Sequence, residues 1–147
     1  MWSASARALF GFIAAAISVL TFHQGMIAFL HALRVSPFTA YRTYPVPPWG
    51  VPLIADLCFW GGLYGVVFGL LLPRFTWPTW LCGTILGIIA GSVGMFIVAP
   101  IKGAPIAAGW HAWPFVRVLL INGFWGLGVG LILPLMLPRP SRRPRPA

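Results

Sequence analysis

The chain has 147 residues, of which 59% are hydrophobic and only 7% are charged, and its mean hydropathy is +0.89. A soluble domain carries about 25% charged residues, so this composition excludes a water-soluble surface. The formal net charge is +9, and Asp56 is the only carboxylate side chain. A single carboxylate excludes paired-carboxylate hydrolysis and carboxylate-bridged metal sites.

Four apolar runs follow one another along the chain: residues 9–33, 51–72, 81–99 and 115–137. Each matches the roughly 20 residues that a helix needs to cross a bilayer. Helices satisfy their own backbone in lipid, and the chain lacks the alternation of a membrane β-barrel. The first run exceeds the length of a signal-peptide core, about 7–15 residues, so we interpret it as an uncleaved span. The sequence predicts an all-α integral membrane protein with four transmembrane helices.

Basic residues lie at the ends of these runs, which gives the positive charge a role in membrane orientation rather than in nucleic-acid binding. One side of the membrane would carry Arg7, Arg74, Arg139, Arg142, Arg143 and Arg145, and the other Arg34, Arg42, Lys102 and Arg117. The excess predicts that both termini are cytoplasmic, in the inner (plasma) membrane of a cell. The basic Pro/Arg tail, residues 140–147, either lies along anionic headgroups or is a stop-transfer segment without a partner.

An internal similarity links the second and fourth runs. When Phe59 is aligned with Phe124, residues 59–61 match 124–126, Gly65 matches Gly130, and residues 72–74 match 137–139. The pattern predicts one membrane domain of two tandem helical hairpins, residues 1–74 and 75–139. Because each hairpin has two spans, this would be a parallel repeat about an axis along the membrane normal.

Glycines recur at every fourth position and form one face of each helix. They are Gly61, Gly65 and Gly69 in the second run, Gly83, Gly87 and Gly91 in the third, and Gly126 and Gly130 in the fourth. Small residues let helix backbones approach closely in lipid. These grooves either pack the four helices together or leave one face for a partner subunit.

The polar residues of the spans gather on one side of the membrane. With both termini inside, His23, Gln24, His31, Asp56, His111, Arg117 and Asn122 all lie between the middle of the membrane and its outer face. Ionisable groups at this depth are costly and point to function. We expect Asp56 to contact Arg117 or a histidine, either as a structural pair or as part of a proton, cation or ligand site.

His23 lies deep in the first span. Its imidazole suits a hydrogen bond between helices, a bond to a quinone, lipid or polar solute, or ligation of haem or a pigment. No haem motif is present, and His23 and His31 are about 12 Å apart along the helix, too far for one metal ion. We therefore predict no metal site and no resident cofactor, and keep haem, pigment or quinone at His23 as the exception.

Two tryptophans, Trp60 and Trp125, are equivalent in the repeat. Each lies within one helical turn of a polar residue, Asp56 or Asn122. They either line a pocket that opens outward or fill the interior of the bundle.

Two classes of function fit these features, and neither is enzymatic, because the chain has no catalytic motif. The first is an accessory or assembly subunit of a larger membrane complex. The alternative is an oligomeric transporter, channel or binding protein for a small solute, ion, quinone or lipid, which uses the polar site of the outer leaflet. The expected partners are membrane lipids together with other subunits or further copies. A membrane enzyme using His23, His31, His111 and Asp56 is the weakest alternative.

Overall fold

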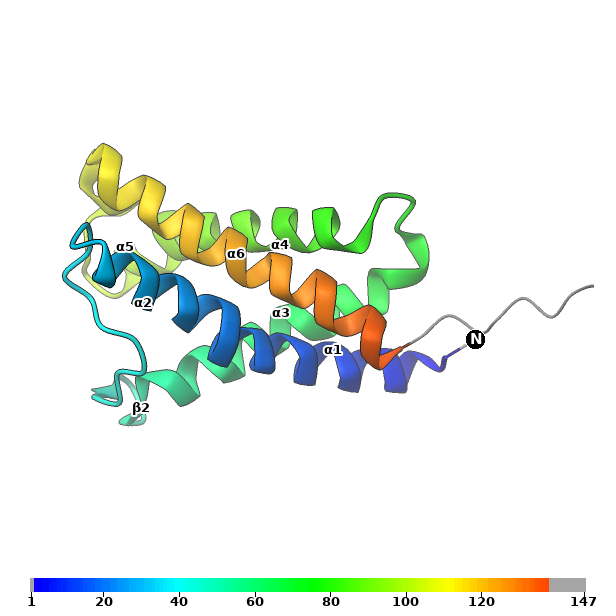
Figure 1. Cartoon of the computed structure of the whole chain (residues 1–147). Coiled ribbons are helices and arrows are strands. Elements are labelled where there is room, and N and C mark those ends of the chain that lie inside the picture. Colours follow the sequence, from blue (N-terminus) through cyan, green and yellow to red (C-terminus); the bar gives the residue numbers. More distant parts are fainter. Residues whose placement is uncertain (1, 138–147) are drawn as a thin grey trace, which may run out of the picture.

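The computed structural model describes residues 2–137, which form long helices joined by short connections (Figure 1). The first helix is continuous through α1 (Ala4–Ser18), the π-helical η1 (Val19–His23) and α2 (Gln24–Ala32). The second is α3 (Leu53–Leu71) with the 3-10 turn η2 (Leu72–Arg74). The third comprises α4 (Thr79–Val93), the π-helical η3 (Gly94–Val98) and α5 (Ala99–Ile101), and the fourth is α6 (Ala112–Met136).

Two connections carry small elements of their own. Between α2 and α3, β1 (Pro45–Val46) and β2 (Val51–Pro52) pair antiparallel, with Val46 opposite Val51. Between α5 and α6 lies the 3-10 segment η4 (Ile106–Trp110). Both connections are at the end of the bundle away from the N-terminus (Figure 1).

Within the described residues, four helices are long and apolar enough to cross a membrane: Ala4–Ala32, Leu53–Arg74, Thr79–Ile101 and Ala112–Met136. They coincide with the four predicted runs and indicate a membrane-embedded protein. The first begins earlier than predicted because the Ser3 hydroxyl caps it and accepts the Ala6 N–H at 3.1 Å. The fourth also begins earlier, since Pro114 lies in its first turn, where a missing N–H costs no helical bond.

The helices pack as two close pairs. In the first pair α1 lies on α3, in the second α4 lies on α6, and α1 and α6 join the pairs. The start of α1 and the end of α6 are at the same end of the bundle (Figure 1). The two termini of the described chain therefore share one side, although residues 138–147, which include the predicted tail, lie outside the described residues.

Glycines form a row, or seam, along the contact within each helix pair, and these seams hold the two helices of a pair together. A Cβ at Gly65 would collide with the backbone of Gly11 in α1, and one at Gly126 would collide with the backbone of Gly83 in α4. All eight glycines of the predicted grooves lie against another helix of the same chain. Their grooves are used within the molecule, in agreement with the simpler of the two interpretations.

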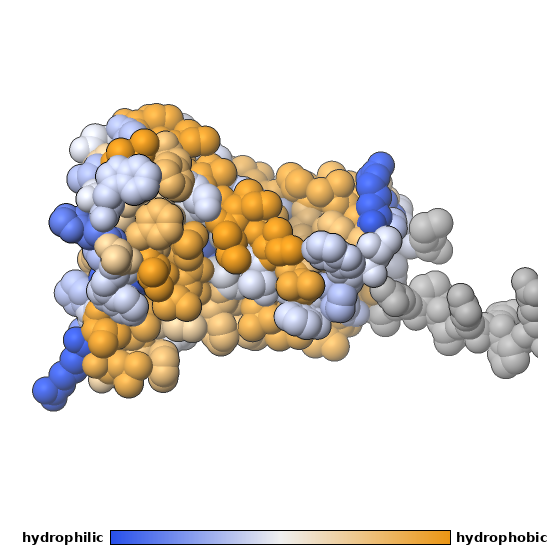
Figure 2. All heavy atoms as spheres, turned by 90° about the horizontal axis from the view of Figure 1, so that it is seen from above, coloured by the Kyte–Doolittle hydropathy of each residue, from blue (hydrophilic) through white to orange (hydrophobic). Residues whose placement is uncertain are grey.

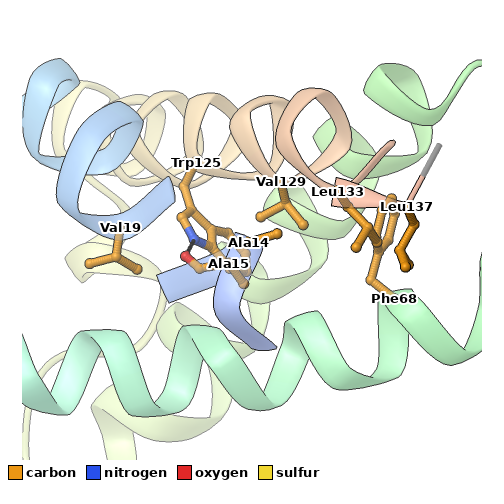
Figure 3. Packing of buried hydrophobic residues seen from close by; sticks show 8 residues of the cluster. All are labelled: Ala14, Ala15, Val19, Phe68, Trp125, Val129, Leu133 and Leu137. Atoms are coloured by element: carbon orange, nitrogen blue, oxygen red, sulfur yellow. Dashed lines mark hydrogen bonds between the residues drawn. The ribbon is translucent and has the colours of Figure 1, made fainter. Parts of the chain in front are cut away.

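The core lies where α1 meets α6 (Figure 3). The Trp125 side chain is 2% exposed, and its indole N–H donates to the Ala15 carbonyl at 3.1 Å. In return the Ser18 hydroxyl donates to the Trp125 carbonyl at 2.6 Å. These two bonds satisfy the polar groups of the core, where an unpaired donor would be costly.

Large apolar side chains cover the outside of the bundle. Figure 2 shows hydrophobic residues over most of the middle of one face, with hydrophilic side chains toward its ends. Examples from three helices are Leu9, Val67 and Ile89, each at least half exposed. In water this surface would be unstable, whereas lipid chains cover it at no cost.

Candidate functional site

A cavity of about 250 Å³ lies toward the end of the bundle opposite the termini, where α2, the start of α3, α6 and the α2–α3 connection meet. Four of the predicted polar residues line it: His23, Gln24, Arg117 and Asn122. The connection adds Phe38, Arg42 and Tyr44, and the apolar wall consists of Ile27, Leu53, Leu57, Val118 and Ile121. Convergent polar groups on a largely apolar wall are typical of small-molecule sites.

A π-helical turn presents two consecutive residues of the first helix to this cavity. The segment η1 ends at His23, and Gln24 begins α2. An extra residue in the turn changes the direction of the side chains that follow, and such turns are frequent at functional sites. The Thr21 hydroxyl donates to the Ile17 carbonyl at 2.8 Å, which gives that helical acceptor a partner beside the widened turn.

Gln24 is 2% exposed, and both the oxygen and the nitrogen of its side-chain amide form hydrogen bonds. Its Oε1 accepts the Tyr41 backbone N–H at 2.7 Å, which fixes the orientation of the amide. The Nε2 group then faces His23 Nδ1 at 3.1 Å and can only donate to it. A neutral His23 consequently carries its proton on Nε2.

This hydrogen bond bears on the haem alternative. A histidine that ligates iron through Nε2 donates from Nδ1 to its surroundings, whereas here Nδ1 accepts. The Gln24 amide thus occupies Nδ1 of His23 and leaves Nε2 as its other ring nitrogen. Among residues 2–137, no group of three His, Cys, Asp or Glu side chains is placed to hold a metal ion.

Tyr41 attaches the α2–α3 connection to the first helix. Besides its N–H bond to Gln24, its hydroxyl donates to the Leu20 carbonyl within η1 at 2.8 Å. Its backbone is left-handed, with φ of 54°, a conformation that non-glycine residues adopt only when held there. Because Tyr41 is fixed, the next residue, Arg42, is placed at the cavity.

Two arginines share one aromatic ring at the cavity. The guanidinium carbons of Arg42 and Arg117 each lie 4.6 Å from the centroid of Phe38, and Arg42 also lies 5.5 Å from that of Tyr44. Cation–π contacts of this kind stabilise a desolvated guanidinium. Within residues 2–137 neither arginine has a carboxylate partner, so the cavity is a concentration of positive charge.

The expected contact of Asp56 with Arg117 or a histidine does not form in the described part of the chain. Asp56 is half-buried and accepts the Trp60 indole N–H at 3.1 Å, on its own helix. It lies in the first turn of α3, where the N–H groups and the helix dipole favour a negative charge. A local partner therefore replaces the predicted interhelical one.

The remaining predicted residues also lie outside the cavity. His31 is exposed and donates through Nδ1 to the Ser36 carbonyl at 3.2 Å, and His111 is exposed at the start of α6. Trp60 is half exposed on α3, whereas Trp125 fills the core. The two tryptophans thus occupy different environments, and neither lines the cavity.

Sequence reasoning missed the contribution of the connection. Arg42 counted only as an orientation charge, while Phe38 was not singled out. A signal was present, because residues 38–44 hold Phe38, Arg42 and two tyrosines within seven positions. Nothing in that spacing shows that the segment folds back over α2.

Comparison of the chain with protein-family models, with curated proteins and with solved structures gives no match.

Proposed function

We propose that this protein binds a small amphiphilic solute from its membrane surroundings, in the cavity between α2, α6 and the α2–α3 connection. The single observation that carries this function is the lining of that cavity, which combines two guanidiniums and two amide side chains with five aliphatic side chains. Such a lining matches a molecule with a polar head and an apolar body. This is the binding-protein alternative among the functions expected from the sequence.

The segments around the cavity are held in place by hydrogen bonds, which supports a binding site rather than a packing defect. Gln24 and Tyr41 fix the connection to the first helix, and the Trp113 indole N–H donates to the Val35 carbonyl at 2.7 Å. The walls of the cavity therefore come from both helix pairs and are tied by hydrogen bonds. A preformed site of this kind loses little entropy when its ligand binds.

A pair of tryptophan substitutions on α6 tests the proposal. Ile121 lines the cavity, whereas its neighbour Leu120 is 42% exposed on the outside of the helix. We expect Ile121→Trp to abolish binding of a short-chain amphiphile and Leu120→Trp to leave it unchanged, as measured by calorimetry on the protein in lipid nanodiscs. Equal binding by both variants would place the ligand elsewhere.

The accessory-subunit function draws less support from the fold than it did from the sequence. It depended in part on glycine grooves open to a partner, yet each of those glycines meets a helix of its own chain. Extraction in a mild detergent separates the two functions. Recovery in a homogeneous small oligomer favours the binding protein, and recovery only within a large assembly favours the accessory subunit.

We also propose that the two helix pairs descend from one duplicated hairpin, with both termini cytoplasmic. In support, the first helix of each pair contains a π-helical segment, η1 or η3. The glycine contacts of the two helix pairs also correspond, but their register differs from that of the sequence alignment by one helical turn. Gly65 meets Gly11 as Gly126 meets Gly83, whereas the alignment matches Gly65 with Gly130.

A further inference from the structure

We infer that the ligand of this cavity is an organic phosphate, whose oxyanion is held by Arg42 and Arg117 while its apolar arm packs on the apolar side chains of the lining. This inference rests on the proposed function and adds the charge and the chemical class of the ligand. It follows from the state of the two arginines, from the remaining donors and from the apolar wall, taken in turn.

The two guanidiniums are close together and, within residues 2–137, have no anionic partner. Each lies 4.6 Å from the centroid of Phe38, so their central carbons are at most twice that distance apart. Two like charges this close, partly removed from water, repel each other and are costly to desolvate. A bound anion offsets both costs, which a neutral ligand such as a quinone does not.

Donors suited to an oxyanion are still free at the site. Neither Arg42 nor Arg117 donates a hydrogen bond to another residue of the described chain, so their N–H groups remain available, and His23 Nε2–H is a further donor. Guanidiniums bind phosphate through two parallel N–H···O bonds. A phosphate has enough oxygens to receive bonds from two arginines at once, and a charge of up to −2 matches theirs.

The apolar wall excludes a bare inorganic ion as the preferred ligand. The apolar lining comes from three helices: Ile27 from α2, Leu53 and Leu57 from α3, and Val118 and Ile121 from α6. An inorganic phosphate would leave this wall without a partner, whereas an alkyl or acyl arm gains about 0.8 kcal/mol for each buried CH₂. The combination calls for an amphiphile with one phosphate group.

Binding of butyl phosphate, compared with 1-butanol, tests this ligand class. The full chain in phosphatidylcholine nanodiscs is titrated by calorimetry, and empty nanodiscs give the background. The variants are Arg42→Gln, Arg117→Gln and the matched control Arg34→Gln, whose arginine is exposed at the same end of the bundle but does not line the cavity.

We expect each cavity variant to weaken butyl phosphate binding about ten- to a hundredfold, the effect of losing one charge-assisted hydrogen-bond pair. The control should stay within about twofold. Arg117→Lys keeps the positive charge but cannot form the two parallel N–H···O bonds of a guanidinium, so its affinity for butyl phosphate should fall between those of wild type and Arg117→Gln. This variant also provides the test if a glutamine variant fails to fold. Unchanged binding in both Arg42 and Arg117 variants overturns the inference, as does 1-butanol binding as tightly as butyl phosphate.

A second experiment identifies the source of the phosphate. Nanodiscs containing one part of phosphatidic acid in ten of phosphatidylcholine are analysed by native mass spectrometry. Phosphatidic acid that stays bound to the wild type but not to Arg117→Gln, and that competes with butyl phosphate, identifies a lipid headgroup. Butyl phosphate binding that phosphatidic acid does not affect identifies a water-soluble phosphate.

The two proposals fail in different ways. If 1-butanol binds and Ile121→Trp removes that binding while the arginine variants change nothing, the cavity binds amphiphiles without an anion, and only the inference is wrong. If Ile121→Trp leaves the binding of both probes intact, the proposed function itself is wrong.

Discussion

Among single residues, Gln24 connects the scaffold to the candidate site. Its buried amide bonds the backbone of Tyr41 on one side and the imidazole of His23 on the other. One side chain thus fixes the connection that carries Arg42 and sets the tautomer of His23. Gln24 was expected only as a member of the polar group, since the sequence does not reveal that it meets a residue 17 positions away.

Substitution of Gln24 by leucine tests this role. The Tyr41 N–H would lose its acceptor in a part-buried place, which costs about 1 kcal/mol, and Arg42 would no longer be held at the cavity. We expect a lower unfolding temperature together with weaker butyl phosphate binding. Thr84→Val is the control, because the Thr84 hydroxyl bonds only to the Trp80 carbonyl within its own helix, α4, and does not line the cavity. Wild-type affinity in Gln24→Leu would show that Arg42 is positioned by other contacts.

Asp56 leads to the opposite expectation. Among residues 2–137 its hydrogen-bond partner is Trp60 on the same helix, and an asparagine oxygen also accepts that bond, although without the negative charge. We expect Asp56→Asn to lower the free energy of unfolding by no more than about 1 kcal/mol, the interaction of one charge with the N-terminus of a helix. Ligand affinity should also be unchanged. A large loss of either, measured by denaturant titration and calorimetry, would reveal a partner for this carboxylate.

At the scale of helices, the glycine seams determine which helices pair. Gly87 lies so close to α6 that a Cβ there would collide with the Asn122 backbone carbonyl, whereas a Cβ at Gly25 would have nothing within 4 Å. We expect Gly87→Ala to destabilise the protein by about 1–3 kcal/mol, because two backbones must separate. Gly25→Ala should be neutral or stabilising by up to about 1 kcal/mol, the helix propensity of alanine.

Denaturation in mixed micelles, followed by circular dichroism, compares these two variants. The two variants differ only in which glycine receives the methyl group, so the difference between their free energies of unfolding measures the close contact of Gly87 with α6. Equal stability of Gly87→Ala and Gly25→Ala would mean that α4 and α6 separate easily.

The helices were predictable from the sequence, but their relative register was not. Length and hydropathy sufficed for four spans, since burial in lipid depends on composition over a whole helix. The pairing of faces depends on individual close contacts. In the proposed duplication, the glycine contacts make Tyr64, rather than Trp60, the counterpart of Trp125. Trp60 is half exposed and Trp125 is buried, and the ring centroids of Tyr64 and Trp125 lie 6.3 Å apart.

The sequence likewise predicted polar residues for the site but not which of them meet there. Polar residues in a span are recognisable because each is costly there, and four of the predicted set do line one cavity. Which of them meet depends on how α2 turns after η1 and on where the connection folds back. Periodicity does not contain that information, so Asp56, His31 and His111 were grouped with residues that they do not join.

For the whole molecule, the shared end of the described termini makes orientation testable. A version lacking Cys58 and Cys82 would carry either Thr76→Cys, in the η2–α4 connection, or Ala104→Cys, in the α5–α6 connection at the other end. With a membrane-impermeant maleimide, we expect labelling of Ala104→Cys in intact cells and of Thr76→Cys only after permeabilisation. The reverse pattern would place the cavity toward the cytoplasm.

The π-helical turn η1 also has a consequence for insertions and deletions. Each residue of an α-helix accounts for about 100° of rotation, whereas a π-helical turn holds one residue more in nearly the same rotation, so the surplus residue of Val19–His23 is absorbed within η1. Deletion of one residue inside η1 would therefore give an ordinary helix in which α1 and α2 keep their relative orientation. Deletion of one residue in α1 between Gly11 and η1 would instead turn Gln24 by about 100° relative to the glycine seam of α1, and the proposed binding residues would separate while the helix pair stayed together.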